Sequence, residues 1–221
     1  MGKGLYVMLN YNEIEAVLFD MDGTIFDSET VHREAWKITA GQFGQVFTND
    51  MYLQFIGVTT PDCMKLAVNM FDHAFELEQF SPCYYDNLKT LAQTAVPLKQ
   101  GFQAYLNKLK LLNKPLGLVT SSGQSGVESN FAHYDFLDDF TVIISRDDVS
   151  HFKPHPEPYL KACQKLGVQP SKTLVFEDSN TGATAAIEAG CVTVGIPDLM
   201  PFNEDVAKRL SLNLKSFEAL L

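Results

Sequence analysis

The sequence predicts an α/β protein in which a doubly wound parallel sheet is interrupted by an inserted, all-helical segment. From residue 97 onward, short apolar runs alternate with amphipathic segments, as in parallel strands joined by right-handed helical crossovers. Residues 28–96 show helical patterns alone. We therefore expect a core formed by residues 1–27 and 97–221 and a helical domain at 28–96.

The first expected strand is the apolar run Ala16-Val17-Leu18-Phe19. An uninterrupted run of this kind is typical of a parallel strand that is covered on both faces. It ends in Asp20-Met21-Asp22-Gly23-Thr24, which places two carboxylates just beyond the strand, where ligands bind in open α/β sheets. Because like charges this close repel, the pair implies a cation. An Asp-rich turn that closes an ordinary strand is the structural alternative.

The remaining elements follow from helix caps, proline and glycine signals, and apolar periodicity. In the insertion we expect helices at 28–43, 59–71 and 81–95. In the core we expect helices at 101–113, 125–134, 156–166, 181–189 and 203–210, and strands at 115–119, 141–144, 173–176 and 191–196.

The composition indicates which kinds of molecule the chain can bind. A formal net charge of −10 disfavours nucleic acid and anionic membranes, because phosphate surfaces need clustered Lys and Arg. We expect a small-molecule partner, a monomer, and no membrane span or signal peptide. The cysteines show no metal-binding spacing and predict reduced thiols in the cytoplasm. They are Cys63, Cys83, Cys163 and Cys191.

Polar side chains at the ends of three expected strands should converge at one edge of the sheet. They are Asp20 and Asp22, Thr120 and Ser121, and Glu177 and Asp178. Lys153 adds a cation from a proline-stiffened loop. Carboxylates, hydroxyls and one lysine suit a phosphate and a hard divalent cation, which favours Mg²⁺.

These segments resemble the motifs of the haloacid dehalogenase superfamily. Asp20-Met21-Asp22-Gly23-Thr24 is similar to its nucleophile signature DxDGT, Thr120 to its second motif, and Lys153 before Pro154 to its third. Glu177-Asp178, with Ser179, Asn180 and Gly182, is similar to its acidic fourth motif. The resemblance spans essentially the whole chain and points to the β-phosphoglucomutase and phosphatase-like subfamily, which has a Rossmann-like core and a helical C1 cap.

The resemblance implies a role for each motif residue. Asp20 would be the nucleophile that forms an aspartyl phosphate, and Asp22 the general acid and base. Thr120, Ser121 and Lys153 would bind phosphoryl oxygens. The metal would be held by Asp20, the backbone carbonyl of Asp22 and Asp178, with Glu177 a direct or an outer ligand.

Each motif after the first also has a purely structural reading. Thr120 or Ser121 could cap a helix, Lys153 could be a solvated loop lysine, and Glu177-Asp178 could serve the dipole of the next helix. All of these structural readings would have to hold together at the ends of successive strands, which favours the catalytic interpretation.

In the resembled family, a helical insertion after the first motif is a cap that closes over the site. We expect hinges near residues 26–28 and 96–99 and a small phosphorylated metabolite, such as a sugar phosphate, as the substrate. His32 matches a histidine that the mutases of this subfamily use beside the general acid; Trp36 is more typical of a core residue.

Hydrolysis is favoured over hexose-phosphate mutase activity of the β-phosphoglucomutase type, which remains the enzymatic alternative. The mutases carry an arginine shortly after a Gly-Val turn of the cap, whereas Gly57-Val58-Thr59 leads here to Thr60.

Other classes fit less well. Dehalogenases lack the second aspartate, and phosphonate cleavage needs a cap lysine that Lys37 and Lys65 do not supply persuasively. A phospho-accepting receiver module has its motifs in a different order. A non-catalytic binding protein would be expected to have lost a motif residue, and none has been lost.

Overall fold

A computed structural model describes residues 9–56, 58, 60–71 and 77–221. The chain forms two compact units. The first unit contains the described residues up to Ile25 together with Leu98–Leu221, and the second is Phe26–Pro97. Among the described residues, no helix is both long enough and apolar enough to cross a membrane.

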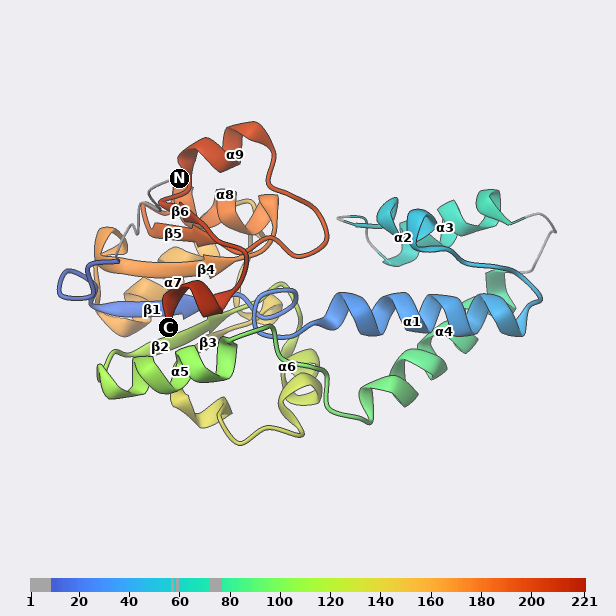
Figure 1. Ribbon diagram of the computed structural model, residues 1–221, viewed down its shortest axis with the longest axis horizontal. Coiled ribbons are helices and arrows are strands. Elements are labelled where there is room, and N and C mark those ends of the chain that lie inside the picture. The colour runs from blue at the N-terminus through green and yellow to red at the C-terminus, as the bar shows by residue number, and fades with distance from the viewer. Residues whose placement is uncertain (1–8, 57, 59, 72–76) are drawn as a thin grey trace, which may run out of the picture. The chain divides into compact units, whose positions relative to one another are not determined.

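Across the described part of the first unit, six parallel strands form one sheet in the order β3-β2-β1-β4-β5-β6 (Figure 1). The strands are β1 Ala16–Phe19, β2 Leu116–Val119, β3 Phe140–Ile144, β4 Thr173–Glu177, β5 Val192–Gly195 and β6 Leu212–Asn213. The central strand β1 pairs with β2 and β4, and the order reverses around it. This arrangement confirms the doubly wound parallel sheet.

The strand register brings the polar clusters to one edge. Phe19 lies opposite Leu118 of β2 and Phe176 of β4. Asp20 therefore follows β1 at the level where Glu177 closes β4, and its backbone N–H donates to the Phe176 carbonyl over 3.0 Å.

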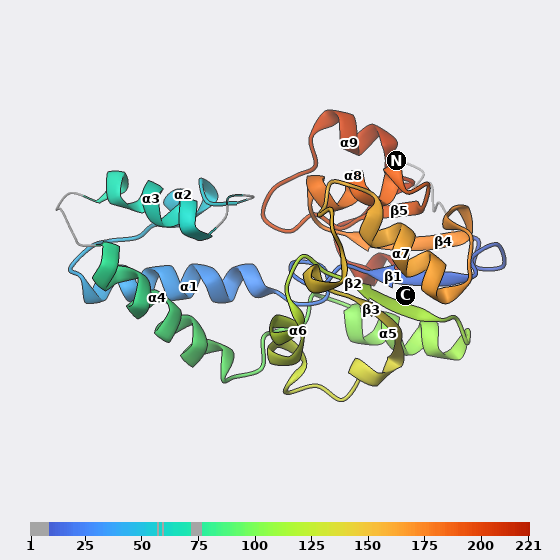
Figure 2. The same ribbon diagram turned by 180° about the vertical axis from the view of Figure 1, so that it is seen from behind.

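Successive side chains of the central strands point to opposite faces of the sheet, so the core has two parts, one on each face. Leu18 and Val175 pack in a fully buried cluster with residues of α7, Glu157–Leu166, and α8, Asn180–Glu188. Phe19 and Phe176 point to the other face, where they stack at 5.1 Å between ring centroids. Phe102 and Tyr105 of α5, Phe102–Leu111, pack against these rings. Figure 1 shows α5 in front of the sheet, and Figure 2 shows α7 and α8 from behind.

Element ends in the core differ from prediction by a few residues. The expected helices at 101–113, 125–134 and 203–210 are α5, α6 Gln124–Phe131 and α9 Glu204–Arg209. All three end before the expected residue, since helix ends fray and their boundaries are weakly marked in sequence. Strand β6 was not predicted, since two residues carry no periodic signal.

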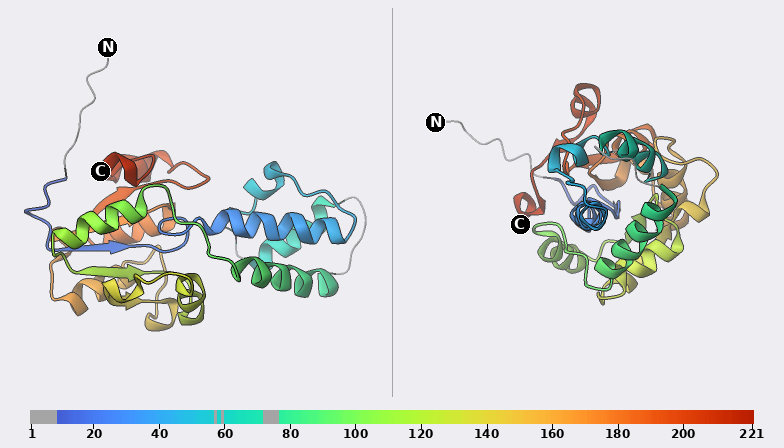
Figure 3. Two further views of the ribbon diagram at one scale, coloured as in Figure 1. Left: turned by 60° about the horizontal axis from the view of Figure 1, so that its bottom comes forward. Right: turned by 90° about the vertical axis from the view of Figure 1, so that its right-hand side faces the viewer.

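The elements described in the second unit are all α-helices, joined by turns and loops. Its helices are α1 Ser28–Gln42, α2 Asn49–Leu53, α3 Thr60–Met70 and α4 Leu77–Ala92. α4 runs back beside α1 (Figure 3, left), and Trp36 of α1 contacts the rings of Tyr84 on α4 and Phe55. Trp36 is therefore a core residue, as expected from its residue type.

Two elements of this unit depart from the prediction. α4 begins at Leu77, four residues before the expected start, and contains Pro82 in its interior. A helix that began at residue 81 would have Pro82 in its first turn, where proline is best tolerated. The short helix α2 was missed although Thr48 caps it by accepting a hydrogen bond from the Met51 backbone N–H.

The connecting segments of the insertion run side by side. The Asp27 backbone N–H donates to the Pro97 carbonyl over 2.8 Å, and the Lys99 N–H donates to the Ile25 carbonyl over 2.8 Å. These bonds lie in the segments expected to act as hinges.

Candidate active site

Lys153 joins two of the predicted carboxylates. Its ammonium lies 2.6 Å from Asp20 Oδ1 and 2.7 Å from Glu177 Oε1, and it donates to the Val119 carbonyl over 2.9 Å. The lysine side chain is only 5% exposed, which excludes the reading of Lys153 as a solvated loop residue. Asp20 and Glu177 are buried with it.

Glu177 is held by donors on both carboxylate oxygens. Oε1 also accepts a hydrogen bond from the buried Tyr159 hydroxyl over 2.7 Å. Oε2 accepts from the Ser179 hydroxyl and from the backbone N–H groups of Asp178 and Ser179. Gly182 in the first turn of α8 makes room for this carboxylate, since a Cβ at that position would lie 1.8 Å from Oε1.

Asp178 lies close to Asp20 and Glu177. One ligand oxygen from each of these three residues lies within 4.8 Å of the other two. The Thr24 hydroxyl donates to Asp178 Oδ1 over 3.4 Å. Gly23 has a positive φ of 84°, and a Cβ there would lie 2.2 Å from Asp178 Oδ2, so this turn requires glycine.

A fourth carboxylate, which the sequence analysis missed, borders this group. Asp198 follows β5, and its Oδ2 would lie 3.3 Å from a Cβ at Gly23. Its Oδ1 accepts from the Lys99 ammonium over 2.6 Å. Lys99 belongs to the connecting segment that leaves the insertion, so this ion pair ties that segment to the acidic end of the site.

Burial of like charges shifts the pKa values of the group. Burial raises the pKa of Asp20 to about 7, even though Lys153 opposes the shift. Burial, with Asp20 and Glu177 as neighbours, raises the pKa of Asp178 well above its ordinary value. Burial alone would lower the pKa of Lys153, but Asp20 and Glu177 raise it above its ordinary value.

The donor set fits a hard divalent cation. Three carboxylates lie close together, and two of them contact the single ammonium of Lys153, which leaves an excess of negative charge. Oxygen ligands of this kind suit Mg²⁺. Asp20, Glu177 and Asp178 are the residues whose side chains could hold it.

The second aspartate of the motif is oriented by the segment after β2. Ser122 donates to Asp22 Oδ2 over 2.7 Å, and Asn130 of α6 donates to Oδ1 over 3.1 Å. Thr120 is buried beside them, and its hydroxyl accepts from the Ser122 backbone N–H over 3.0 Å. Ser121 is exposed at the same turn.

Three of these contacts were not predicted. Asn130 lies within a helix, where an asparagine normally indicates a solvated position. Tyr159 lies six residues after Lys153, among the buried residues of α7. Its hydroxyl was the only feature in the sequence that could have indicated a polar contact at this position. Ser122 lies at the predicted strand end, but its position in the sequence does not indicate a contact with Asp22.

His32 lies in the second unit. Its Nδ1 is 2.8 Å from the Tyr84 hydroxyl. Lys37 and Lys65 pair with Glu34 and Asp62 over one helical turn. The Gly57-Val58-Thr59 turn, on which the argument against mutase activity depended, lies largely outside the described residues, because Gly57 and Thr59 are not described.

Comparison with known proteins identifies the family of this chain. The model of the family described as haloacid dehalogenase-like hydrolase matches residues 17–196. The "Phosphorylated carbohydrates phosphatase" of Thermotoga maritima is 31% identical over 80% of this chain and 82% of its own length. The "Validoxylamine A 7'-phosphate phosphatase" of Streptomyces hygroscopicus subsp. limoneus is 34% identical over 82% and 85%.

A solved structure shows the same fold. A candidate beta-phosphoglucomutase from Thermotoga maritima is similar to 94% of this chain over 97% of its own, with a TM-score of 0.82 and 28% identity. The fold and the family expected from the four motifs are thus confirmed. The chain belongs to the haloacid dehalogenase-like hydrolase family and is an enzyme of its phosphatase type.

Proposed function

We propose that the chain is a Mg²⁺-dependent phosphatase that hydrolyses a small phosphorylated metabolite, a sugar phosphate in particular, through an aspartyl-phosphate intermediate. The observation that carries this proposal is the buried contact of Lys153 with Asp20 and Glu177 beside Asp178. The names of the two phosphatase relatives, which concern phosphorylated carbohydrates and validoxylamine A 7'-phosphate, support the substrate class.

Asp20 is the nucleophile in this proposal. Its carboxylate attacks phosphorus, the bond to the leaving oxygen breaks, and the phosphoryl group rests on Asp20 until water releases it. Lys153 pairs with the carboxylate and lies where it can also donate to a phosphoryl oxygen. Thr120 and the backbone near Ser121 supply further donors at the same edge of the sheet.

Asp22 moves the protons. It protonates the leaving oxygen in the first half of the reaction and accepts a proton from the attacking water in the second. Ser122 and Asn130 hold its carboxylate beside the site, and these bonds restrict the directions in which it can transfer a proton.

Asp20, Asp178 and the Asp22 backbone carbonyl would hold Mg²⁺ in this proposal. When bound, the ion neutralises charge and polarises the phosphoryl oxygens. Each oxygen of Glu177 already accepts two or more hydrogen bonds from protein donors. We therefore assign Glu177 to the positioning of Lys153 and of the turn after β4, and direct coordination to Asp20 and Asp178.

The helical unit acts as the cap, with residues 26–28 and 96–99 as hinges, and selects the substrate. His32 on α1 is the residue of the cap that we expect to meet the substrate or Asp22. The Tyr84 hydroxyl, 2.8 Å from its Nδ1, fixes the orientation of the imidazole. The enzyme works as a monomer in the cytoplasm.

Hydrolysis and mutase activity can be separated in one experiment. Phosphate release from a panel of sugar phosphates is measured with Mg²⁺ and with EDTA, alongside conversion of β-glucose 1-phosphate to the 6-phosphate in the presence of a bisphosphate primer. We expect Mg²⁺-dependent phosphate release and no primed conversion. Primed conversion without phosphate release would instead support the mutase. Asp20→Asn should abolish phosphate release, whereas the exposed Asp205→Asn should retain it.

A further inference from the structure

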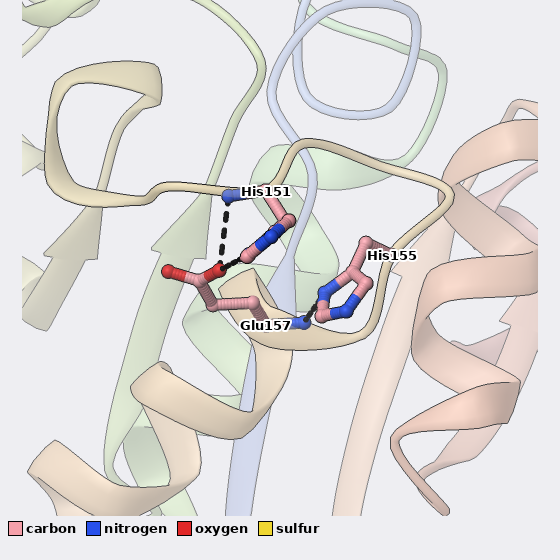
Figure 4. A group of neighbouring side chains, drawn as sticks. All are labelled: His151, His155 and Glu157. Carbon is pink, nitrogen blue, oxygen red and sulfur yellow. Dashed lines mark hydrogen bonds and ion pairs between the residues drawn. The ribbon is translucent and has the colours of Figure 1, made fainter.

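A second group of metal-ligating side chains lies outside the carboxylate site. It consists of His151, His155 and Glu157, at the start of α7 (Figure 4). One ligand atom from each residue, an imidazole nitrogen or a carboxylate oxygen, lies within 4.8 Å of the other two. None of these residues contributes to the site described above.

Glu157 holds the loop that carries the two histidines through three hydrogen bonds that involve backbone N–H groups. Its Oε1 accepts from the Ser150 backbone N–H over 2.8 Å, and its Oε2 accepts from the His151 backbone N–H over 2.9 Å. The Glu157 N–H donates to His155 Nδ1 over 3.2 Å. The chain between positions 150 and 157 is thereby folded back on itself, so that residues four apart become neighbours.

The two imidazole rings lie against each other on this loop. Their centroids are 4.6 Å apart and their planes differ by 29°. His151 Nδ1 is 2.7 Å from Glu157 Oε2, and the His151 side chain is 66% exposed. Both residues are exposed. Rotation of the His151 and His155 rings would exchange their own contacts with Glu157 for a metal ion, but it would leave the bonds from the Ser150 and His151 backbone N–H groups to the Glu157 carboxylate in place.

The donor set differs from that of the carboxylate site. Two imidazoles and one carboxylate suit zinc and related transition ions, whereas Mg²⁺ prefers oxygen ligands alone. Ligand atoms at about 2.1 Å from a tetrahedral ion are roughly 3.4 Å apart. The ligand atoms here are at most 4.8 Å apart, so rotation of the exposed rings can close the difference.

We propose that His151, His155 and Glu157 bind a divalent transition-metal ion of the zinc class at a site separate from the catalytic carboxylates. Lys153 lies between the two histidines in sequence, but its ammonium is buried against Asp20 and Glu177. A bound ion would link the two ends of the loop that carries Lys153. The proposal stands independently of the substrate and of the phosphatase mechanism.

The test is a Zn²⁺ titration of the full-length protein, without a polyhistidine tag and in excess Mg²⁺, followed by calorimetry and by the imidazole C–H NMR signals. We expect Zn²⁺ to shift the signals of His151 and His155. His151→Ala and His155→Ala should each weaken binding by about tenfold or more. The exposed His133→Ala is the matched control and should bind Zn²⁺ as the unchanged protein does.

Two further variants distinguish the loop site from the carboxylate site and from a folding defect. Asp178→Asn disrupts the carboxylate site and should leave the loop site intact. If Zn²⁺ no longer shifts the His151 and His155 signals in Asp178→Asn, the proposal is overturned. Wild-type affinity in both His151→Ala and His155→Ala would also overturn it. His155→Asn keeps a polar side chain in case alanine disturbs the loop, and NMR of the unmodified protein tests the site without any substitution.

Discussion

Lys153 and Asp20 form a buried ion pair across 133 residues of sequence, with 2.6 Å between Nζ and Oδ1. The pair exists because a loop before α7 and the end of β1 meet at one edge of the sheet. Glu177 shares the same ammonium at 2.7 Å. Removing the lysine therefore leaves two buried carboxylates without their cation.

Lys153→Ala should lower both stability and activity. Breaking a buried charge pair by removing one partner typically costs about 3–5 kcal/mol of unfolding free energy. Urea unfolding of the metal-free protein measures this loss, and steady-state kinetics measure the fall in kcat. Lys165→Ala is the control, since this half-exposed lysine reaches Asp148 only at 3.9 Å and should change stability by less than about 1 kcal/mol. Equal effects of the two substitutions would contradict the assigned role of Lys153.

The stability of the metal-free protein should depend on the protonation of Asp20. Burial raises the pKa of Asp20 from 3.8 to about 7, so between these values the folded state binds the proton more tightly than the unfolded state. The contribution of Asp20 to stability is therefore full below about pH 4 and is lost as the pH rises through about 7. Unfolding in EDTA across this range should show a smaller loss of stability in Asp20→Asn than in the unchanged protein. An identical pH dependence of the two proteins would rule out this account of Asp20.

Gly182→Ala should displace Glu177. The added Cβ would lie 1.8 Å from Glu177 Oε1, which is shorter than any van der Waals contact. Forcing a group into a packed site typically costs about 1–3 kcal/mol. We expect that loss in urea unfolding and a fall in kcat. Gly41→Ala, also in a helix but with no atom within 4 Å of the added Cβ, should be neutral or slightly stabilising. If Gly182→Ala is as active as Gly41→Ala, the geometry of Glu177 is not required for catalysis.

Ser122→Ala and Asn130→Ala should slow the reaction without weakening substrate binding. Each removes one hydrogen bond to the Asp22 carboxylate but leaves the carboxylate itself. The fall in kcat should be smaller than the roughly 10²–10⁴-fold that loss of a general acid–base residue costs. Steady-state kinetics should show kcat lowered with KM little changed. Asn107→Ala on the exposed side of α5 is the control and should leave both constants unchanged. An effect on KM alone would assign Ser122 and Asn130 to substrate binding.

The sequence predicted the elements whose local pattern agrees with their surroundings. Strand β1 was predicted residue for residue, because four consecutive apolar residues followed by a polar turn are typical of a strand buried on both faces of a sheet. The convergence of Asp20 and Glu177 followed from strand order, since both lie at the carboxyl ends of neighbouring parallel strands. Lys153 needed the motif resemblance as well, because a loop lysine has no periodic signal of its own.

The unpredicted parts depend on tertiary contacts. Asn130 and Tyr159 lie in helices, and no local pattern states that one side chain reaches Asp22 and the other Glu177. Asp198 lies in a loop whose position beside Asp178 depends on how the chain leaves β5. The start of α4 was expected at residue 81, but the helix begins at Leu77 and continues through Pro82, a residue type that is best tolerated in the first turn of a helix.

The central claim is that Asp20 carries the phosphoryl group. Rapid acid quench of the enzyme during turnover of a sugar phosphate, followed by mass spectrometry of its peptides, tests this claim most directly. We predict a phosphoryl group on Asp20 that forms only with Mg²⁺ and is absent from Asp20→Asn. Continued phosphate release by Asp20→Asn, with no phosphoryl group on the peptide that contains Asp20 in the unchanged enzyme, would contradict it.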